Sequence, residues 1–117
     1  NSFLNRLAVK SRHESEKLVG INLFFITQSF KAIPPVIRKQ TDLFVLLKSA
    51  SREYIIDNIS FEVGSHFTKE EIGEYYDEIM KIDYGSLILS IHKQEKAENR
   101  VRQGWSKIVE RDKKYLL

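Results

Sequence analysis

The 117-residue sequence contains no cysteine. Disulfide bonds, zinc sites built from thiolates and cysteine nucleophiles are therefore excluded within this chain, which suits a reducing compartment. The three histidines lie far apart, and none has the HxxxH or HExxH spacing that places two metal ligands on one helix face. We therefore predict no metal site.

Long apolar runs are also missing. No stretch approaches the roughly 20 apolar residues that a helix needs to cross a bilayer, so we predict no membrane span. With 42% apolar and 30% charged residues, the composition is typical of a globular chain and not of a disordered one. We expect a soluble protein that is not secreted, with a length that fits one domain and a modest core.

Charge is distributed unevenly along the chain. Residues 1–52 have a balance of +6, residues 53–92 a balance of −7, and residues 93–117 a balance of +4. Two interpretations remain open. Either the charges form ordinary solvated faces, or a basic front and a basic tail face phosphate groups while the acidic middle faces solvent or a basic partner.

Apolar periodicity and capping residues predict alternating helices and strands. Thr68 to Glu71 forms a capping box, and Gly64 is a typical helix end. Nearly continuous apolar runs are typical of strands that are covered on both faces. The predicted helices cover residues 2–16, 34–40, about 51–63 and 68–80, and the predicted strands cover residues 21–27, 43–47 and 87–91.

Strands that are separated by helices favour a parallel sheet. We therefore predict the α/β fold class, with a parallel sheet and flanking helices, followed by a basic tail. Three strands that are covered on both faces need more neighbours than this chain supplies, and the chain opens with Asn1 rather than methionine. We expect the carboxyl-terminal part of a larger α/β domain, or a piece that pairs with another chain.

The predicted tail covers residues 93–117, and we expect it to be helical. Arg100, Arg102 and Lys107 surround Trp105 there, and basic residues beside an aromatic ring can contact a phosphate backbone. The alternative is a helix that packs Trp105 and Ile108 on the sheet and turns its charges outward.

Gln28 stands at the end of the first predicted strand. In open parallel sheets, ligands bind beyond the carboxyl ends of the strands. A neutral amide in that place can orient an attacking water or contact a γ-phosphate without adding charge. The alternative is that Gln28 only satisfies the last hydrogen bonds of the strand.

Four short motifs follow one another in the first part of the chain. They are Ser11-Arg12-His13, Thr27-Gln28-Ser29, Ile33-Pro34 and Ile37-Arg38-Lys39-Gln40. This succession resembles the viral genome-packaging ATPases of the FtsK–HerA superfamily, above all the poxvirus-type packaging ATPase of large DNA viruses. In that family an arginine-histidine pair precedes a core strand ending in Thr-Gln, and Ile-Pro and Ile-Arg-x-Asn follow. Gln40 stands where asparagine is usual.

The resemblance implies roles for five residues. Gln28 is the polar sensor at the nucleotide, and Arg12 and His13 belong to the family motif. Arg38, or Arg52 as a second candidate, is an arginine finger that acts on the ATP of a neighbouring subunit. Such a finger must be permanently charged, planar and carried on a rigid element, which favours Arg38 after its proline-stiffened turn. For each arginine the alternative is a surface ion pair.

The resemblance also implies a setting. Residues 1–92 are the carboxyl-terminal half of a P-loop ATPase-like core in a homo-oligomeric ring that uses ATP and Mg²⁺ to move double-stranded DNA into a capsid. The implied partners are the chain's own amino-terminal half, DNA and capsid proteins. The implied location is the host-cell cytoplasm at virus assembly sites, or the virion.

The chain departs from the family in one respect. It has no GxxxxGK[ST] phosphate loop and no apolar strand that ends in paired acidic residues for Mg²⁺. We therefore expect that it does not hydrolyse ATP alone. The second hypothesis is a non-catalytic nucleic-acid-binding or capsid-interaction module, and the third is a purely structural α/β domain in which Gln28 and Arg38 are incidental.

Overall fold

The structure is a computed structural model that describes residues 24–116 of the chain. The chain forms two compact units, which we call unit 1 (Asn1–Thr41) and unit 2 (Asp42–Leu117). The predicted helix over residues 2–16 lies outside the described residues, and so do Arg12 and His13.

Unit 1 contains a short helix that begins at the second of two consecutive prolines. The 3-10 helix η1 covers Phe30–Ala32, and α2 covers Pro35–Gln40. Because proline has a helical φ and no N–H to satisfy, Pro35 is well suited to the first turn, as the sequence predicted. The predicted strand over residues 21–27 is wrong for its described part. Residues 24–27 are not in a strand, and Ile26 is 100% exposed.

Unit 2 begins with a strand and two helices. The strand β1 covers Leu43–Leu47, and the helices α3 and α4 cover Arg52–Val63 and Lys69–Ile79. Gly64 ends α3, and the Thr68 side chain accepts a hydrogen bond from the Glu71 N–H at 3.1 Å at the start of α4. These bounds confirm the strand over 43–47 and both of the predicted helices.

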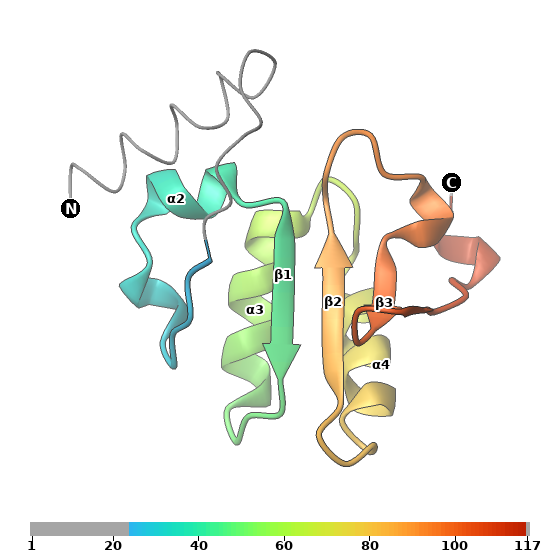
Figure 1. Cartoon of the computed structure of the whole chain (residues 1–117), viewed down its shortest axis with the longest axis horizontal. Coiled ribbons are helices and arrows are strands. Elements are labelled where there is room, and N and C mark those ends of the chain that lie inside the picture. The colour runs from blue at the N-terminus through green and yellow to red at the C-terminus, as the bar shows by residue number, and fades with distance from the viewer. Residues whose placement is uncertain (1–23, 117) are drawn as a thin grey trace. The chain divides into compact units, whose positions relative to one another are not determined.

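The sheet of unit 2 is antiparallel throughout. The strand β2 covers Ser86–Ser90 and pairs antiparallel with β1. Between them α3 leads the chain back along the sheet and α4 returns it, so β2 starts from the end at which β1 stopped (Figure 1). One crossover helix produces parallel neighbours, whereas two helices produce antiparallel ones. The predicted parallel sheet is therefore wrong.

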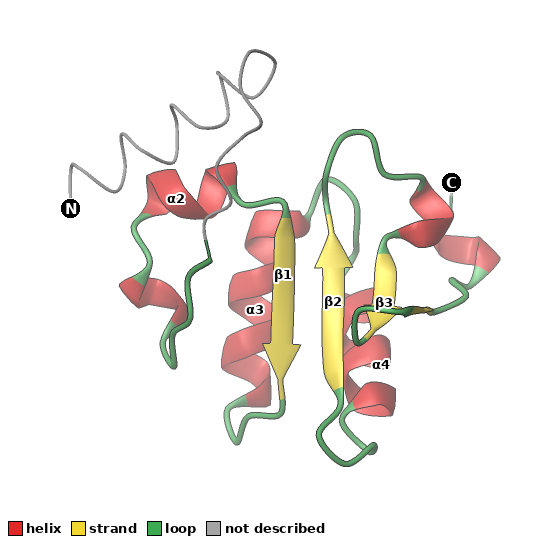
Figure 2. Cartoon of the chain, viewed as in Figure 1, coloured by secondary structure: helices red, strands yellow, loops and turns green. Residues whose placement is uncertain are grey.

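The tail completes this sheet and is not a helix. The strands β3 (Val101–Gln103) and β4 (Lys107–Ile108) form a hairpin, and the order in the sheet is β1-β2-β3-β4 (Figure 2). Gly104 has a φ of 64° in the hairpin loop, which glycine adopts without strain. The 3-10 helices η2 (Ala97–Asn99) and η3 (Lys113–Tyr115) flank the hairpin. The helical prediction failed because this glycine allows a tight turn between two short strands.

The two faces of the sheet differ. The helices α3 and α4 cover one face (Figure 1), on which the core side chains are buried. These core side chains include Phe44, Leu46, Leu87, Leu89 and Val101. On the other face Leu43, Val45 and Leu47 are exposed, so the prediction that this strand is covered on both faces is wrong. The central strand β2 is buried on both faces.

Candidate functional site

Gln28 lies in an irregular segment of unit 1. Its side chain is exposed, and no strand precedes it among residues 24–27. The neighbouring Thr27 hydroxyl donates to the Ser29 carbonyl at 2.9 Å and accepts from the Ser29 N–H at 3.1 Å. This local turn, and not the end of a strand, sets the backbone around Gln28.

Arg38 is held against its own segment. Its Nε donates to the Ile33 carbonyl at 2.9 Å, and its guanidinium lies 5.3 Å from the centroid of the Phe30 ring. A cation at this distance from an aromatic face is attracted by the ring quadrupole. The Arg38 side chain is half-buried. The guanidinium therefore has a restrained orientation, which no residue pattern in the sequence indicated.

Arg52, the second candidate finger, lies in unit 2 at the start of α3. Its Nε and Nη2 donate to the two carboxylate oxygens of Asp77 at 2.6 and 2.9 Å, and it also forms an ion pair with Glu53. The hydrogen bonds from Arg52 lower the pKa of Asp77. Gly73 leaves room for this pair, because a Cβ there would lie 3.1 Å from the Arg52 Nη2. Arg52 thus connects α3 with α4.

We expect Arg52→Ala to lower the free energy of unfolding only slightly. The lowered pKa of Asp77 means that the pair stabilises the fold above pH ~4, and that this contribution is lost as the pH falls through the lowered pKa. Solvent screens an exposed pair, so the effect stays small. Urea unfolding at pH 7 and pH 2.5 measures it, and a difference between the two proteins that persists at pH 2.5 would contradict it.

Arg100 is buried and makes only internal hydrogen bonds among the described residues. Its guanidinium donates to the carbonyls of Ser90, His92 and Glu95 at 3.1, 3.0 and 2.9 Å. It therefore fixes the segment that leads from β2 to β3. The sequence-based hypothesis had Arg100 contact a phosphate backbone. Arg100 is only 7% exposed and is used for internal hydrogen bonds, so it is poorly placed for such a contact.

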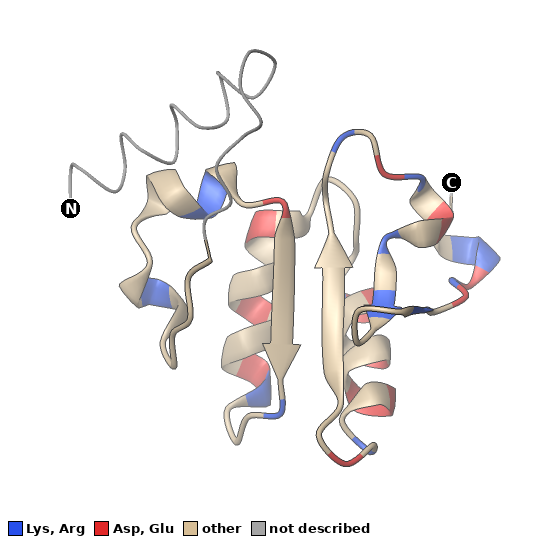
Figure 3. Cartoon of the chain, in the orientation of Figure 1, with Lys and Arg blue, Asp and Glu red and all other residues tan. Residues whose placement is uncertain are grey.

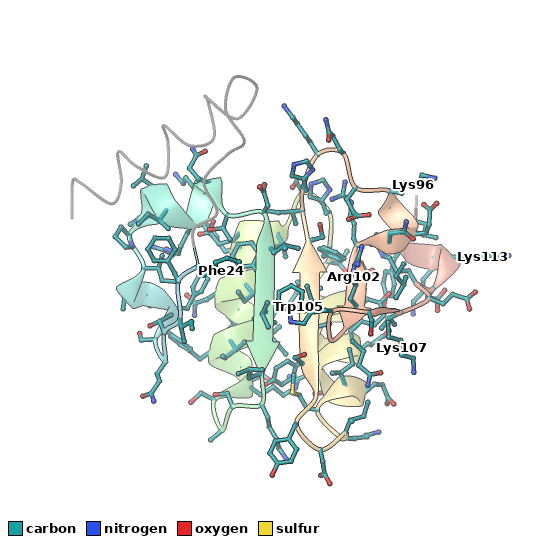
Figure 4. All side chains as sticks on the ribbon, in the orientation of Figure 1. Phe24, Lys96, Arg102, Trp105, Lys107 and Lys113 are labelled. Atoms are coloured by element: carbon teal, nitrogen blue, oxygen red, sulfur yellow. The ribbon has the colours of Figure 1, made fainter. Side chains whose placement is uncertain are left out.

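The other residues of that hypothesis lie on the surface of the β3–β4 hairpin. Trp105 is 64% exposed, Lys107 is exposed, and Arg102 is half-buried. The alternative was a helix that packs Trp105 and Ile108 on the sheet. It is wrong because this segment is a hairpin and not a helix, and because Trp105 and Ile108 are both exposed. Figure 4 shows the Trp105, Arg102 and Lys107 side chains on this one hairpin.

A buried ion pair connects the end of the chain with α4. The Arg111 Nε and Nη2 donate to the two carboxylate oxygens of Glu71 at 2.7 and 3.0 Å. Arg111 also donates to the carbonyls of Ala97 and His66 at 2.7 and 3.2 Å. Its guanidinium lies 4.7 Å from the centroid of the Phe67 ring. Each of the three guanidinium nitrogens thus donates at least one hydrogen bond within the protein, and the network is structural.

The pair also changes the titration of its neighbours. Tyr75 donates to the Glu71 carboxylate at 3.0 Å, and burial together with that negative charge raises the pKa of Tyr75 to about 12. Burial and the positive charges of Arg100 and Arg111 lower the pKa of His66. Both groups therefore stay neutral near pH 7.

The sequence contained a signal for one partner of this pair. Glu71 adjoins Ile72 and lies four residues before Tyr75, so it shares the apolar face of α4. A carboxylate on such a face requires a buried partner. The sequence analysis placed Glu71 in a capping box only. Nothing in the pattern around Arg111 distinguishes it from the other basic residues of the tail.

The described residues contain neither a membrane-spanning helix nor a metal-binding group. Within residues 24–116 no helix is long and apolar enough to cross a membrane, and no group of His, Cys, Asp or Glu residues could hold a metal ion. Comparisons of the chain with protein-family models, curated proteins and solved structures found no match.

Proposed function

We propose that this chain is part of an ATP-driven translocase that packages double-stranded DNA into a viral capsid. The proposal rests on the motif series that resembles the packaging ATPases of the FtsK–HerA superfamily. In it, Gln28 contacts the γ-phosphate or the attacking water. Arg38 acts on the ATP of a neighbouring subunit in a ring, at virus assembly sites in the host-cell cytoplasm or in the virion.

The restraint of Arg38 is the observation that carries this proposal. Its hydrogen bond to Ile33 and its contact with the Phe30 ring limit the positions that the guanidinium can take. A side chain that is ordered before it meets its ligand loses less conformational entropy on binding. The Gln28 amide is exposed, so it is accessible to an ATP molecule that is bound by another polypeptide segment.

ATP and Mg²⁺ in this proposal are bound mainly by a segment outside the 117 residues. The sequence has no phosphate loop and no strand that ends in paired acidic residues. That segment is the amino-terminal half of the same protein, or a separate subunit. Unit 2, with its antiparallel sheet, is then a module attached to the motor, with capsid proteins as possible partners.

A non-catalytic nucleic-acid-binding or capsid-interaction module is the second candidate. The exposed Trp105 and the open face of β1 favour it, because large apolar side chains on a surface mark interaction sites. The two candidates differ in one respect that is easily measured. Only the first requires Gln28 for ATP hydrolysis.

We expect Gln28→Ala to lower ATP turnover while ATP binding stays largely unchanged. An amide that orients the attacking water acts mainly in the transition state, so its loss lowers kcat more than it weakens binding. The measurement is Mg²⁺-dependent ATPase activity, with nucleotide affinity measured separately, on this chain together with the segment that carries the phosphate loop. Gln94→Ala, at an exposed glutamine outside the motif series, is the matched control.

The outcome of this experiment separates the two candidates. Turnover by Gln28→Ala equal to that of the wild-type protein would contradict the proposed ATPase role. The 117-residue chain alone is expected to show no Mg²⁺-dependent turnover. Hydrolysis by the pure chain that Gln28→Ala abolishes would contradict the assignment of ATP binding to another segment.

A further inference from the structure

We propose that the β3–β4 hairpin binds single-stranded nucleic acid, with Trp105 stacked on a base and with Arg102 and Lys107 on the adjoining phosphates. The geometry, not the ATPase resemblance, leads to this proposal. It removes Arg100 from the nucleic-acid-binding residues that the sequence suggested, and it makes Trp105 the main contact.

The hairpin presents Trp105 to solvent. The loop of residues 104–106 joins β3 and β4, and Trp105 is 64% exposed within it. At Gly104 a Cβ would meet nothing within 4 Å, so the loop is open on that side. An indole ring in such a place offers a flat surface on which a base can stack.

The basic side chains of the hairpin come from the strands on either side of this loop. Arg102 donates to the Trp105 carbonyl at 3.4 Å, and Lys107 pairs in register with Gln103. Arg102 also lies 3.6 Å from the Glu95 carboxylate, a long contact that a phosphate can replace. Arg102 pairs with Ile108 and Lys107 with Gln103, so the two cations lie on opposite faces of the hairpin. A strand that crosses the loop can therefore meet one cation on each side of Trp105.

The surrounding charge is complementary to a polyanion. Residues 101–109 contain two basic residues and no acidic one. Figure 3 shows the acidic residues gathered along α3 and α4, on the covered side of the sheet, and many of the basic ones after β2. Within the hairpin itself no carboxylate repels phosphate groups, and Glu95, which lies 3.6 Å from Arg102, is a nearby acidic residue that a phosphate would displace.

The same charges argue against an apolar protein partner at this place. Such a partner would remove Lys107 from water without supplying a negative charge and would leave Arg102 with the long contact to Glu95 as its counter-charge, which is costly. Charged residues are accordingly depleted at the cores of protein interfaces. A base with its phosphate offers both a flat apolar surface and the counter-charge.

A single strand fits better than a duplex. Bases within a duplex are already stacked on one another, so the Trp105 ring has no free base face to meet there. Unpaired bases have both faces available, and stacking on an aromatic ring does not depend on sequence. We therefore expect a preference for single strands without strong sequence specificity.

Trp105 is the only tryptophan in the chain, so its fluorescence reports directly on the proposed site. Titration with oligo(dT) is expected to quench the emission of the 117-residue chain. Anisotropy of labelled oligo(dT) should show that Trp105→Ala weakens binding about 5- to 150-fold, the range measured for stacking on one base. Trp105→Phe, which keeps an aromatic ring, should retain most of the affinity.

Salt dependence tests the phosphate contacts. Each contact with a single strand adds about −0.7 to the slope of log K against log salt, so two cations give about −1.4. Lys107→Ala should reduce the slope by about 0.7. Lys81 lies just after α4 and pairs with Glu78. Lys81→Ala removes the same charge away from the hairpin and should leave the slope unchanged.

Four results would overturn the proposal. They are the absence of binding, equal affinity of Trp105→Ala and the wild-type chain, binding of a duplex of equal length as tight as that of the single strand, and a shift of Trp105 emission with protein concentration alone. The last result would mean that a second copy of the chain covers the ring. Circular dichroism of each variant checks that the fold is kept.

Discussion

Replacing Arg111 by alanine is expected to lower the free energy of unfolding of unit 2 by about 3–5 kcal/mol. The reason is the state of Glu71 after the change. Glu71 is 1% exposed, and its carboxylate would lose both hydrogen bonds from the guanidinium, which leaves a buried charge without its cation and with the Tyr75 hydroxyl as a donor. Domains are stable by only about 5–15 kcal/mol, so the loss is a large fraction of the total.

Thermal and urea unfolding measure this effect. The melting temperature should fall by at least about 10 °C for a domain of this size. Lys114→Ala is the matched control, since it removes a nearby exposed cation that lies 3.8 Å from Glu74, and it should change stability little. Replacing both Arg111 and Glu71 by methionine should cost less than Arg111→Ala alone, because no charge then remains buried. Equal stability of Arg111→Ala and the wild-type chain would contradict the structural role.

Arg38→Ala is expected to lower ATP turnover of the complete protein by up to ~10³-fold, the scale seen for arginine fingers. The charge and planar shape of a guanidinium are needed where negative charge develops in the transition state. The measurement is steady-state ATPase activity. Lys39→Ala, which removes an exposed cation from the next position of α2, should leave turnover nearly unchanged.

Mixed subunits reveal whether Arg38 acts on a neighbour. When Arg38→Ala subunits are mixed with subunits that lack a working phosphate loop, some activity should return, because one supplies the intact pocket and the other the finger. Gln28→Ala subunits in the same mixture should give no such rescue, since both lesions then affect one pocket. Full activity of Arg38→Ala would contradict the proposed role and would mean that Arg38 makes only a surface contact.

Local signals in the sequence were sufficient to predict the first four elements of unit 2, from β1 to β2. Gly64 ends α3, and the Thr68 side chain caps α4 by accepting a hydrogen bond from the Glu71 N–H. Both signals act within a few residues of the chain. The strand over 43–47 was also found from its apolar run. The same reasoning failed for residues 24–27, because an apolar run becomes a strand only where a neighbouring strand pairs with it.

The direction of the sheet depended on information that is not local. The number of helices between β1 and β2 decides whether the strands run parallel, and the sequence did suggest two helices there. The error came from applying the rule for a single crossover helix to a pair. In the tail, Gly104 was the only local sign of a turn, and it was outweighed by the expectation of a helix.

Side-chain positions in the candidate sites were the hardest to predict. Arg100, Arg102 and Lys107 look alike in the sequence, yet Arg100 is buried on three carbonyls while Lys107 is exposed. Which basic residue lies inside depends on how β3 pairs with β2. Pairing between distant segments sets this, so composition alone could not separate structural from accessible cations.

The Glu71–Arg111 pair also affects how unit 2 folds during synthesis. The two residues are 40 positions apart, and ribosomes add about 5–20 residues each second. Glu71 therefore leaves the ribosome roughly 2–8 s before the guanidinium that neutralises it. Until then α4 cannot bury its apolar face without burying a bare carboxylate as well. Unit 2 thus completes its core only after Arg111 has left the ribosome, and we expect a nascent chain that stops before Arg111 to be a substrate for chaperones and proteases.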